Sequence, residues 1–169
     1  FLFIFLSACS TMSARKAAGP RSTPAAAVQD NKTVLNPEVY YHFLSGQQCL
    51  ADQNLGCALN EFTAALDYDN ESSYLHLQIC QIHTLQGNFE EALTWCQKAA
   101  ALDPLHTETR FLLARIYAAV NRIDDAASEY SALIRINPED EEPYLSLTLI
   151  YAAQKKYPQA FKTIHKLLT

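Results

Sequence analysis

The sequence predicts an all-α fold in which a pair of helices repeats about four times. Within each period, apolar residues recur at steps of three and four, as in Phe89, Ala92 and Cys96, which is the spacing of one helix face. Polar dipeptides and prolines divide the chain into segments of helical length. A period of 34 residues is marked by one alanine column: Ala58, Ala92, Ala126 and Ala160. Self-similarity at this period is the signature of a repeat architecture.

The repeated units follow one another without gaps at 39–72, 73–106, 107–140 and 141–169, the last being incomplete. A turn dipeptide separates the two helices of each unit: Gln53-Asn54, Gly87-Asn88, Asn121-Arg122 and Lys155-Lys156. Three units are expected to start where Asn or Asp precedes Pro, because the side chain caps the helix and proline suits its first turn. These starts are Asn36-Pro37, Asp103-Pro104 and Asn137-Pro138, while Asn70-Glu71 lacks the proline. The acidic run Glu139-Asp140-Glu141-Glu142 fits the positive end of a helix dipole.

A second column of small residues runs through the first helices of the units: Gly46, Cys80, Ala114 and Thr148. Small side chains let two antiparallel helices approach closely. Over residues 37–169, these columns together resemble the tetratricopeptide repeat (TPR). The resemblance implies a right-handed superhelical solenoid whose role is protein–protein interaction rather than catalysis.

The N-terminal residues 1–8 form an apolar run that is too short to cross a bilayer, which takes about 20 residues. They are interpreted as the remnant of a signal peptide. The string Leu6-Ser7-Ala8-Cys9 that ends this run is similar to the bacterial lipobox. The resemblance implies that Cys9 becomes the N-terminus and carries a diacylglycerol and an acyl chain such as palmitate. Ser10 then favours the outer membrane, facing the periplasm; the alternative is an ordinary cleaved signal with a plain cysteine.

Residues 9–36 are expected to be a flexible linker, because Ser, Thr, Ala and Pro dominate and bulky apolar residues are few. The repeated units, residues 39–169, carry 9 basic and 16 acidic residues. A nucleic-acid-binding protein needs a basic surface stripe, so the sequence argues against a nucleic-acid partner.

The sequence predicts no catalytic site, no cofactor and no metal. It contains four glycines, and neither a Gly-rich phosphate loop nor a Ser-His-Asp pattern is evident. His76, Cys80 and His83 share an expected helix face. However, His76 and His83 would lie about 10 Å apart along the axis, too far for one zinc ion.

Five cysteines are present, of which four remain if Cys9 is lipidated. Export favours an oxidising compartment. Cys80 and Cys96 lie in facing columns of the second unit and form the most plausible disulfide. Cys49 and Cys57 lie across the turn of the first unit, and the alternative is that all four are small apolar packing residues.

The resemblance implies that the first helices of successive units line a concave groove that holds a partner. The residues in the groove columns are Tyr40, Phe43, Gln47, Tyr74, Leu77, Gln81, Phe111 and Arg115. The column of Phe43, Leu77, Phe111 and Leu145 has an equally weighted alternative, which is packing of helix against helix. TPR domains that clamp chaperone C-termini use Lys and Asn in such columns. This chain has Phe or Leu, and Gln or Arg, in those places, so a chaperone tail is not the expected ligand.

Together these features predict a lipid-anchored scaffold of the bacterial envelope that binds a protein or peptide. Possible settings are pilus or secretion biogenesis and outer-membrane assembly. Two alternatives stay open. The chain is expected to stop inside the second helix of its fourth unit, so it could be the non-catalytic part of a longer enzyme or a longer repeat array. It could also be a structural module that self-associates through its apolar groove.

Overall fold

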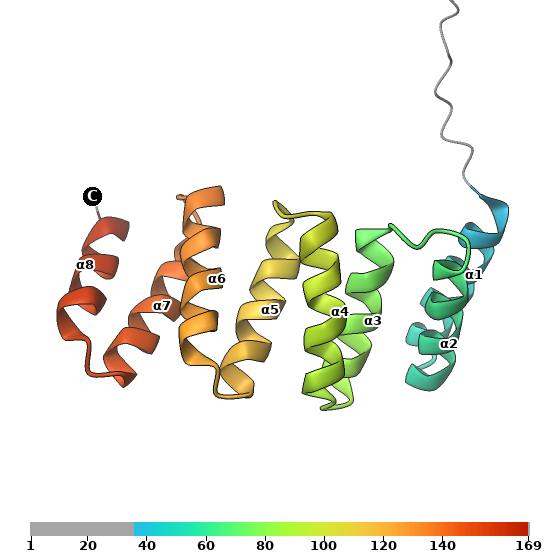
Figure 1. Cartoon of the computed structure of the whole chain (residues 1–169), viewed down its shortest axis with the longest axis horizontal. Coiled ribbons are helices and arrows are strands. Elements are labelled where there is room, and N and C mark those ends of the chain that lie inside the picture. The colour runs from blue at the N-terminus through green and yellow to red at the C-terminus, as the bar shows by residue number, and fades with distance from the viewer. Residues whose placement is uncertain (1–35, 169) are drawn as a thin grey trace, which may run out of the picture. The chain divides into compact units, whose positions relative to one another are not determined.

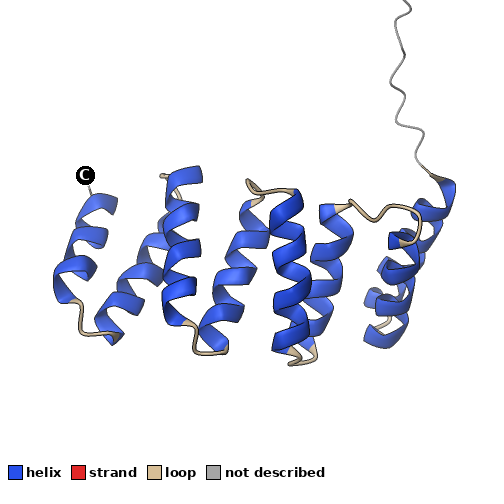
Figure 2. Cartoon of the chain, viewed as in Figure 1, coloured by secondary structure: helices blue, strands red, loops and turns tan. Residues whose placement is uncertain are grey.

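The computed structural model describes residues 36–168, and this part of the chain contains eight α-helices and no strand (Figures 1 and 2). The helices are α1 (Pro37–Ala51), α2 (Leu55–Leu66), α3 (Ser73–Leu85), α4 (Phe89–Leu102), α5 (Thr107–Ala119), α6 (Ile123–Ile136), α7 (Glu141–Ala153) and α8 (Tyr157–Leu167). They belong to one compact unit, Val34–Thr169. The predicted all-α class is confirmed. The signal segment, Cys9 and nearly all of the linker lie outside the described residues.

The helices pack as antiparallel pairs, α1 with α2, α3 with α4, α5 with α6 and α7 with α8, and each pair contacts the next along the chain (Figure 1). This nearest-neighbour arrangement is that of a solenoid. The pairs α3–α4, α5–α6 and α7–α8 fall inside the units expected from the 34-residue period, whereas α1 begins at Pro37, two residues before the first expected unit. The face formed by the first helices of the pairs, α1, α3, α5 and α7, is called the inner face below.

The turn inside each pair has the same backbone conformation in all four repeats. One residue per turn has a positive φ, between 57° and 77°: Gln53, Gly87, Asn121 and Lys155. The amide of the following residue donates a hydrogen bond to the carbonyl five residues back, as from Asn54 N to Cys49 O at 2.8 Å. This is the Schellman arrangement that ends a helix through a left-handed residue. The predicted turn dipeptides therefore lie where the chain reverses.

The helix starts differ from three of the predictions, and at the weakest of them, Asn70-Glu71, the cap of α3 is Ser72 rather than Asn70. Asn36 caps α1 as expected, accepting from Glu38 N at 3.0 Å. Asp103 and Asn137, in contrast, follow the last residues of α4 and α6, and α5 and α7 begin at Thr107 and Glu141. The predicted starts at Asp103-Pro104 and Asn137-Pro138 are wrong because these side chains instead close short turns. Asp103 Oδ1 accepts from Leu105 N at 3.2 Å, and Asn137 Oδ1 accepts from Glu139 N at 3.3 Å.

The actual caps of α5 and α7 are His106 and Asp140. Asp140 Oδ1 accepts from Glu142 N at 3.1 Å, and Glu141 and Glu142 occupy the first turn of α7. The acidic run is thus part of a helix start, where negative side chains face the positive end of the dipole.

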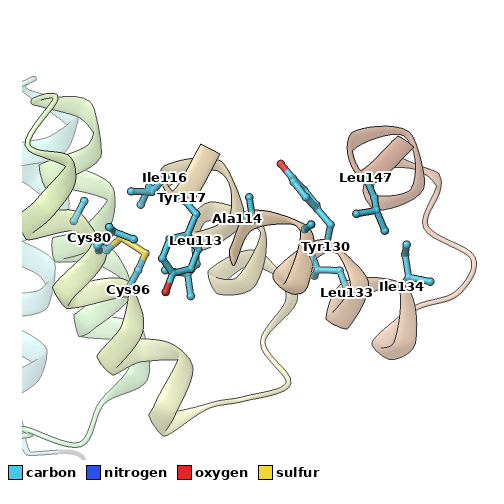
Figure 3. Packing of buried hydrophobic residues seen from close by; sticks show 14 of the residues in the cluster. Cys80, Cys96, Leu113, Ala114, Ile116, Tyr117, Tyr130, Leu133, Ile134 and Leu147 are labelled. Carbon is cyan, nitrogen blue, oxygen red and sulfur yellow. A yellow bond between two sulfur atoms is a disulfide. The ribbon is translucent and has the colours of Figure 1, made fainter. Parts of the chain in front are cut away.

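The core lies between the two helices of each pair and between adjacent pairs. Ala58, Ala92 and Ala126 have no exposed surface, and Ala160 is 7% exposed. Around Cys80 and Cys96, the core continues through α5 and α6 to α7 without a break (Figure 3). Close approach of the helices explains the small residues. A Cβ added at Gly46 would lie 2.7 Å from Cε1 of Phe62.

Two disulfides join the helices of the first two pairs. Cys80 and Cys96 are bonded between α3 and α4 with Cα atoms 5.3 Å apart (Figure 3). Cys49 and Cys57 are bonded across the turn between α1 and α2 with Cα atoms 5.7 Å apart. Both separations lie in the usual range for a disulfide. No helix between residues 36 and 168 is long and apolar enough to cross a membrane.

Candidate partner-binding face

The residues predicted to line a groove come from α1, α3 and α5, so they all belong to the inner face. Tyr40 is 55% exposed and Tyr74 is 47% exposed. Gln47, Gln81, Phe43 and Phe111 are partly buried, and Arg115 is exposed. These seven side chains form two groups that are joined by a row of amides.

Leu77 does not belong to the binding surface. Its side chain is 1% exposed and lies in the interior. The prediction that it contacts a partner is therefore wrong, and the packing alternative holds at this position. Leu145 occupies the same column in the fourth repeat and is 47% exposed.

The first group is an aromatic patch at the N-terminal end of the inner face. Phe43 lies between two rings, with centroids 6.0 Å from Phe62 and 5.7 Å from Tyr74. Phe62 is fully buried, so it fixes the position of Phe43 from below. Tyr40 and Tyr74 keep about half of their surface in solvent. The patch therefore offers apolar ring surface and, at Tyr74, a hydroxyl group on a ring that is positioned by its contact with Phe43.

A row of side-chain amides connects three of the inner helices. Gln47 Nε2 donates to Gln78 Oε1 at 3.4 Å, and Gln78 Nε2 donates to Gln81 Oε1 at 3.2 Å. Gln81 Nε2 then donates to Glu108 Oε1 at 2.9 Å. The row runs from α1 through α3 to α5. It holds Gln47 and Gln81 in one orientation and leaves further donor and acceptor positions for a ligand.

The sequence analysis missed Gln78, which is 7% exposed and lies at the centre of this row. Its column holds Leu44 and Leu112 in the flanking repeats. A glutamine between two leucines in its column was the available signal, because a buried amide needs hydrogen-bond partners.

The second group lines a hollow of about 530 Å³ between α3 and α5. Three predicted residues, Gln81, Phe111 and Arg115, meet there. The remaining lining is formed by Thr84, Leu85, Thr107, Glu108, Leu112, Leu133 and Asp140. A hollow of this size accepts one or two side chains of a ligand, with an apolar floor and charged groups at the rim.

The floor of the hollow is rigid because Phe111 rests against a buried tyrosine. The ring centroids of Phe111 and Tyr130 are 5.6 Å apart and nearly perpendicular. Burial raises the pKa of the Tyr130 hydroxyl, while its hydrogen bond with Ser146 and the positive charge of Arg115 oppose this effect. Arg115 lines the same hollow as Phe111.

A second hollow of about 560 Å³ lies where α2, α3 and α4 meet, and the sequence analysis did not foresee it. His76 and Trp95 line it with ring centroids 5.6 Å apart, and Lys98 Nζ lies 4.5 Å from the Trp95 centroid. The same columns in other repeats hold hydrogen-bonded or ion pairs, His42 with Glu61 and Arg110 with Glu129. These pairs join the two helices of one repeat, so we assign the His76–Trp95 contact the same structural role.

Two of the three residues considered for a metal site, Cys80 and His76, have other partners. Cys80 and Cys96 are bonded to each other. His76 Nδ1 lies 2.8 Å from the carbonyl oxygen of Ser72 in the first turn of its own helix. Among residues 36–168, no group of His, Cys, Asp and Glu is arranged to hold a metal ion.

Comparison with known proteins agrees with this architecture. Two family models described as tetratricopeptide repeat match residues 50–107 and 85–150. Together they cover the chain from the end of α1 to α7. This chain is a tetratricopeptide-repeat protein.

Solved TPR structures superpose well on the chain at low sequence identity. The match to a crystal structure of MamA covers 79% of this chain and 78% of the MamA chain, with a TM-score of 0.71 and 20% identity. A tetratricopeptide repeat protein from Parabacteroides merdae covers 79% of this chain and 53% of its own, with a TM-score of 0.74 and 20% identity. The match to the first TPR of Spaghetti (RPAP3), bound to an HSP90 peptide, covers 70% of this chain and 94% of the solved one, with a TM-score of 0.65 and 18% identity. These likenesses establish the TPR fold.

Curated relatives match part of this chain. DnaJ homolog subfamily C member 3 of Mus musculus is 25% identical over 108 residues, which are 64% of this chain and 21% of the relative. Protein O-mannosyl-transferase TMTC1 of Homo sapiens is 33% identical over 82 residues, which are 48% of this chain and 9% of the relative. The chain therefore spans about a fifth or less of these relatives' length.

Proposed function

We propose that this TPR protein is a scaffold of the bacterial cell envelope whose inner face binds an extended segment of a partner protein. One observation carries the proposal. An exposed aromatic patch around Tyr40 and Tyr74 shares a face with the hollow lined by Gln81, Phe111 and Arg115. Exposed aromatic and arginine side chains beside apolar pockets are the residue types that dominate binding energy at protein interfaces.

The ligand that this face suits is a peptide with apolar side chains separated by backbone that needs hydrogen bonds. One side chain would enter the hollow above Phe111, and a second would rest on the rings of Tyr40 and Tyr74. The amides of Gln47 and Gln81 lie between these positions and can bond to the intervening backbone. Because the amide row and the packed rings hold these groups in place, little side-chain entropy is lost on binding.

Peptide binding by this fold is supported by the solved complex of the first TPR of Spaghetti (RPAP3) with an HSP90 peptide. The proposal for this chain is a different peptide. Its inner columns carry Phe43, Gln47 and Arg115, not the Lys and Asn that hold a chaperone carboxylate. Glu108 and Asp140 at the rim of the hollow favour a basic group of the segment beside them, whereas Arg115 favours a backbone carbonyl or another acceptor.

The test compares two bait proteins that differ only in where two tyrosines are removed. Residues 34–169 contain all eight helices and both disulfides in one compact unit, so they form the bait. The binding variant is Tyr40→Ala with Tyr74→Ala, whose side chains are 55% and 47% exposed. The matched control is Tyr68→Ala with Tyr157→Ala, which are 51% and 64% exposed and lie away from the α3–α5 hollow.

Partners are captured from a periplasmic extract, and folding of each bait is checked by circular dichroism. The proposal expects a partner that the wild type and the control retain and the binding variant loses, with about tenfold or greater weakening for two anchor residues. Adding Arg115→Glu is expected to weaken binding further. A partner retained equally by all baits would place the interaction elsewhere and refute the proposal for the inner face.

The proposed attachment to the outer membrane rests on the string Leu6-Ser7-Ala8-Cys9, which lies outside the described residues. Several acyl chains on Cys9 would hold the protein stably at a lipid surface, at about 0.8 kcal/mol per buried CH₂. The linker 9–36 would then carry the scaffold on the periplasmic side, in pilus or secretion biogenesis or in outer-membrane assembly. The test is incorporation of a palmitate analogue in a bacterial host. The Cys9→Ala variant should lose both the label and its recovery in the membrane fraction. Labelling that persists in this variant would refute lipidation at Cys9.

A further inference from the structure

The outer face of the solenoid, formed by the second helices of the pairs, carries a basic groove between α6 and α8. The first helix α7 packs against both of these helices and lies between them (Figure 1). A hollow of about 290 Å³ opens there, with a floor from α7 and walls from α6 and α8. The residues that line it, called the outer groove below, are Ser131, Ile134, Arg135, Tyr144, Leu147, Tyr151, Lys162, Thr163 and Lys166.

The outer groove contains three cations and no acidic partner for them. Its lining includes Arg135, Lys162 and Lys166 but neither Asp nor Glu. None of the salt bridges within residues 36–168 involves any of these three side chains. Helix α8 has no acidic residue, and Glu129, the acidic residue of α6 nearest in sequence to Arg135, is already paired with Arg110 at 2.7 Å. The positive charge is therefore available to a ligand.

The TPR fold does not require cations at these positions. Residues 34 apart occupy equivalent positions, and the equivalents of Lys162 are Asn60, Thr94 and Ser128. The equivalents of Arg135 in the two preceding repeats are Asp67 and Ala101. The positive charge is thus a property of this groove rather than of the repeat.

The exposure of these side chains does not depend on where the chain ends. All three equivalents of Lys162 are exposed, although another helix pair follows each of them. Lys98, the only other lysine in the column of Lys166, is exposed as well. Arg135 itself is exposed with α7 and α8 following it.

The floor of the outer groove is apolar and well packed. Tyr144, Leu147 and Ile134 are 2%, 4% and 6% exposed. Lys166 Nζ lies 5.9 Å from the centroid of the Tyr144 ring, within the range of a cation–π contact. A ligand in this groove thus meets a small apolar surface that is bordered by positive charge.

The spacing of the cations suits an acidic peptide in extended form. Lys162 and Lys166 are four residues apart on α8, which is about 6 Å along the helix axis. Side chains two residues apart in an extended peptide point to one side and lie about 7 Å apart. Two carboxylates with this spacing reach both lysines. The guanidinium of Arg135 on the opposite wall can donate two parallel hydrogen bonds to a further carboxylate.

An anionic membrane surface suits the groove less well than a peptide does. The repeated units, residues 39–169, carry 9 basic and 16 acidic residues, so the solenoid as a whole is repelled by anionic lipid. A short peptide that enters the groove meets mainly the local positive charge. The methylene groups of a glutamate side chain can also rest on the apolar floor while its carboxylate reaches the rim.

We propose that the outer groove binds a glutamate-rich segment of a partner protein. This surface lies between second helices, so it is separate from the inner face formed by the first helices. A scaffold with both surfaces holds two protein segments at once. The proposal does not depend on the peptide that the inner face binds.

The experiment measures the binding of a fluorescein-labelled octaglutamate peptide to the 34–169 protein by fluorescence anisotropy. An octaglutamine peptide with the same label is the uncharged control. At about 0.05 M salt the protein should bind octaglutamate and not octaglutamine. Raising the salt to about 0.5 M should weaken the binding several-fold, because attraction between exposed charges is screened.

Two double variants then locate the site. Lys162→Glu with Lys166→Glu reverses two charges of the outer groove and should weaken octaglutamate binding by about tenfold or more. The matched control is Lys98→Glu with Lys155→Glu, which changes the net charge equally at two exposed lysines outside the groove. The control should bind within about twofold of the wild type, since charges beyond a Debye length are screened. Circular dichroism checks that both variants are folded.

A wild-type protein that does not bind octaglutamate at low salt would overturn the proposal. Equal weakening in the two variants would also overturn it, because binding would then follow net charge rather than the groove. Vesicles of phosphatidylglycerol provide the last comparison. Vesicle binding that is lost in the groove variant, without binding of octaglutamate, would assign the groove to lipid instead of a protein partner.

Discussion

Gly46→Ala probes how closely α1 and α2 approach each other. The added Cβ would lie 2.7 Å from Cε1 of Phe62, 2.9 Å from Cζ and 3.0 Å from Cδ1. Phe62 has no exposed surface and its ring contacts Phe43, so it has no free space to move into. Overpacking of this kind costs about 1–3 kcal/mol. The higher helix propensity of alanine over glycine offsets about 1 kcal/mol of this loss in unfolding free energy.

Gly56→Ala is the matched control, because it makes the same substitution in α2 without the steric conflict. A Cβ at Gly56 meets only Asn54 Oδ1, at 3.8 Å. Its expected effect is neutral or a stabilisation of up to about 1 kcal/mol. Since the helix preference of alanine is common to both variants, the difference between their unfolding free energies approximates the steric cost, about 1–3 kcal/mol.

The assay is urea unfolding of the 34–169 protein, followed by circular dichroism at the helical band. Phe62→Leu supplies a second check, since it frees space at the contact. It should destabilise the Gly46→Ala protein less than the wild type, which is a coupling between neighbouring residues. If Gly46→Ala is as stable as Gly56→Ala, the close approach of α1 and α2 is not what requires a small residue here.

Three further predictions concern the turns, the disulfides and the buried tyrosine. Lys155→Gly should raise the unfolding free energy by up to about 1 kcal/mol in urea unfolding, because φ at Lys155 is 60° and glycine adopts this region without strain; a loss of stability would contradict this. Replacing Cys80 and Cys96 together by Ala should lower the midpoint of thermal unfolding, with a cost of about 3 kcal/mol for a loop of this length, and an unchanged midpoint would count against the bond. Because burial raises the pKa of Tyr130, its contribution to stability is complete below the unfolded tyrosine pKa of about 10 and is lost as the pH rises toward its folded pKa. Ultraviolet titration should therefore show one late-ionising tyrosine that disappears in Tyr130→Phe, and an unchanged titration would refute the assignment.

Much of the fold followed from the sequence because its determinants are local. Helix faces depend on spacing within about a dozen residues, and each repeat contacts only its neighbours, so one period describes the whole array. The turn dipeptides were predicted correctly for the same reason. The left-handed residue falls in one column, from Gln53 to Lys155, whether it is Gln, Gly, Asn or Lys.

The errors occurred where one local signal had two structural uses. Asp103-Pro104 and Asn137-Pro138 have the residues of a helix start, yet their side chains bond to Leu105 N and Glu139 N in the connecting turns. The sequence suggested a disulfide between Cys80 and Cys96, but it left open the alternative that these cysteines are unpaired packing residues. Pairing depends on the distance between two helices, which the sequence does not give. The amide row through Gln78 was missed because its four members come from three helices.

The sequence by itself determined the number of helices, their pairing and the small residues between them. Only the tertiary structure decided which members of one column reach solvent. Leu77 and Leu145 are the same residue in the same column, yet the first is 1% exposed and the second 47%. Among the described residues, another helix pair packs after the pair that contains Leu77, and none packs after the pair that contains Leu145.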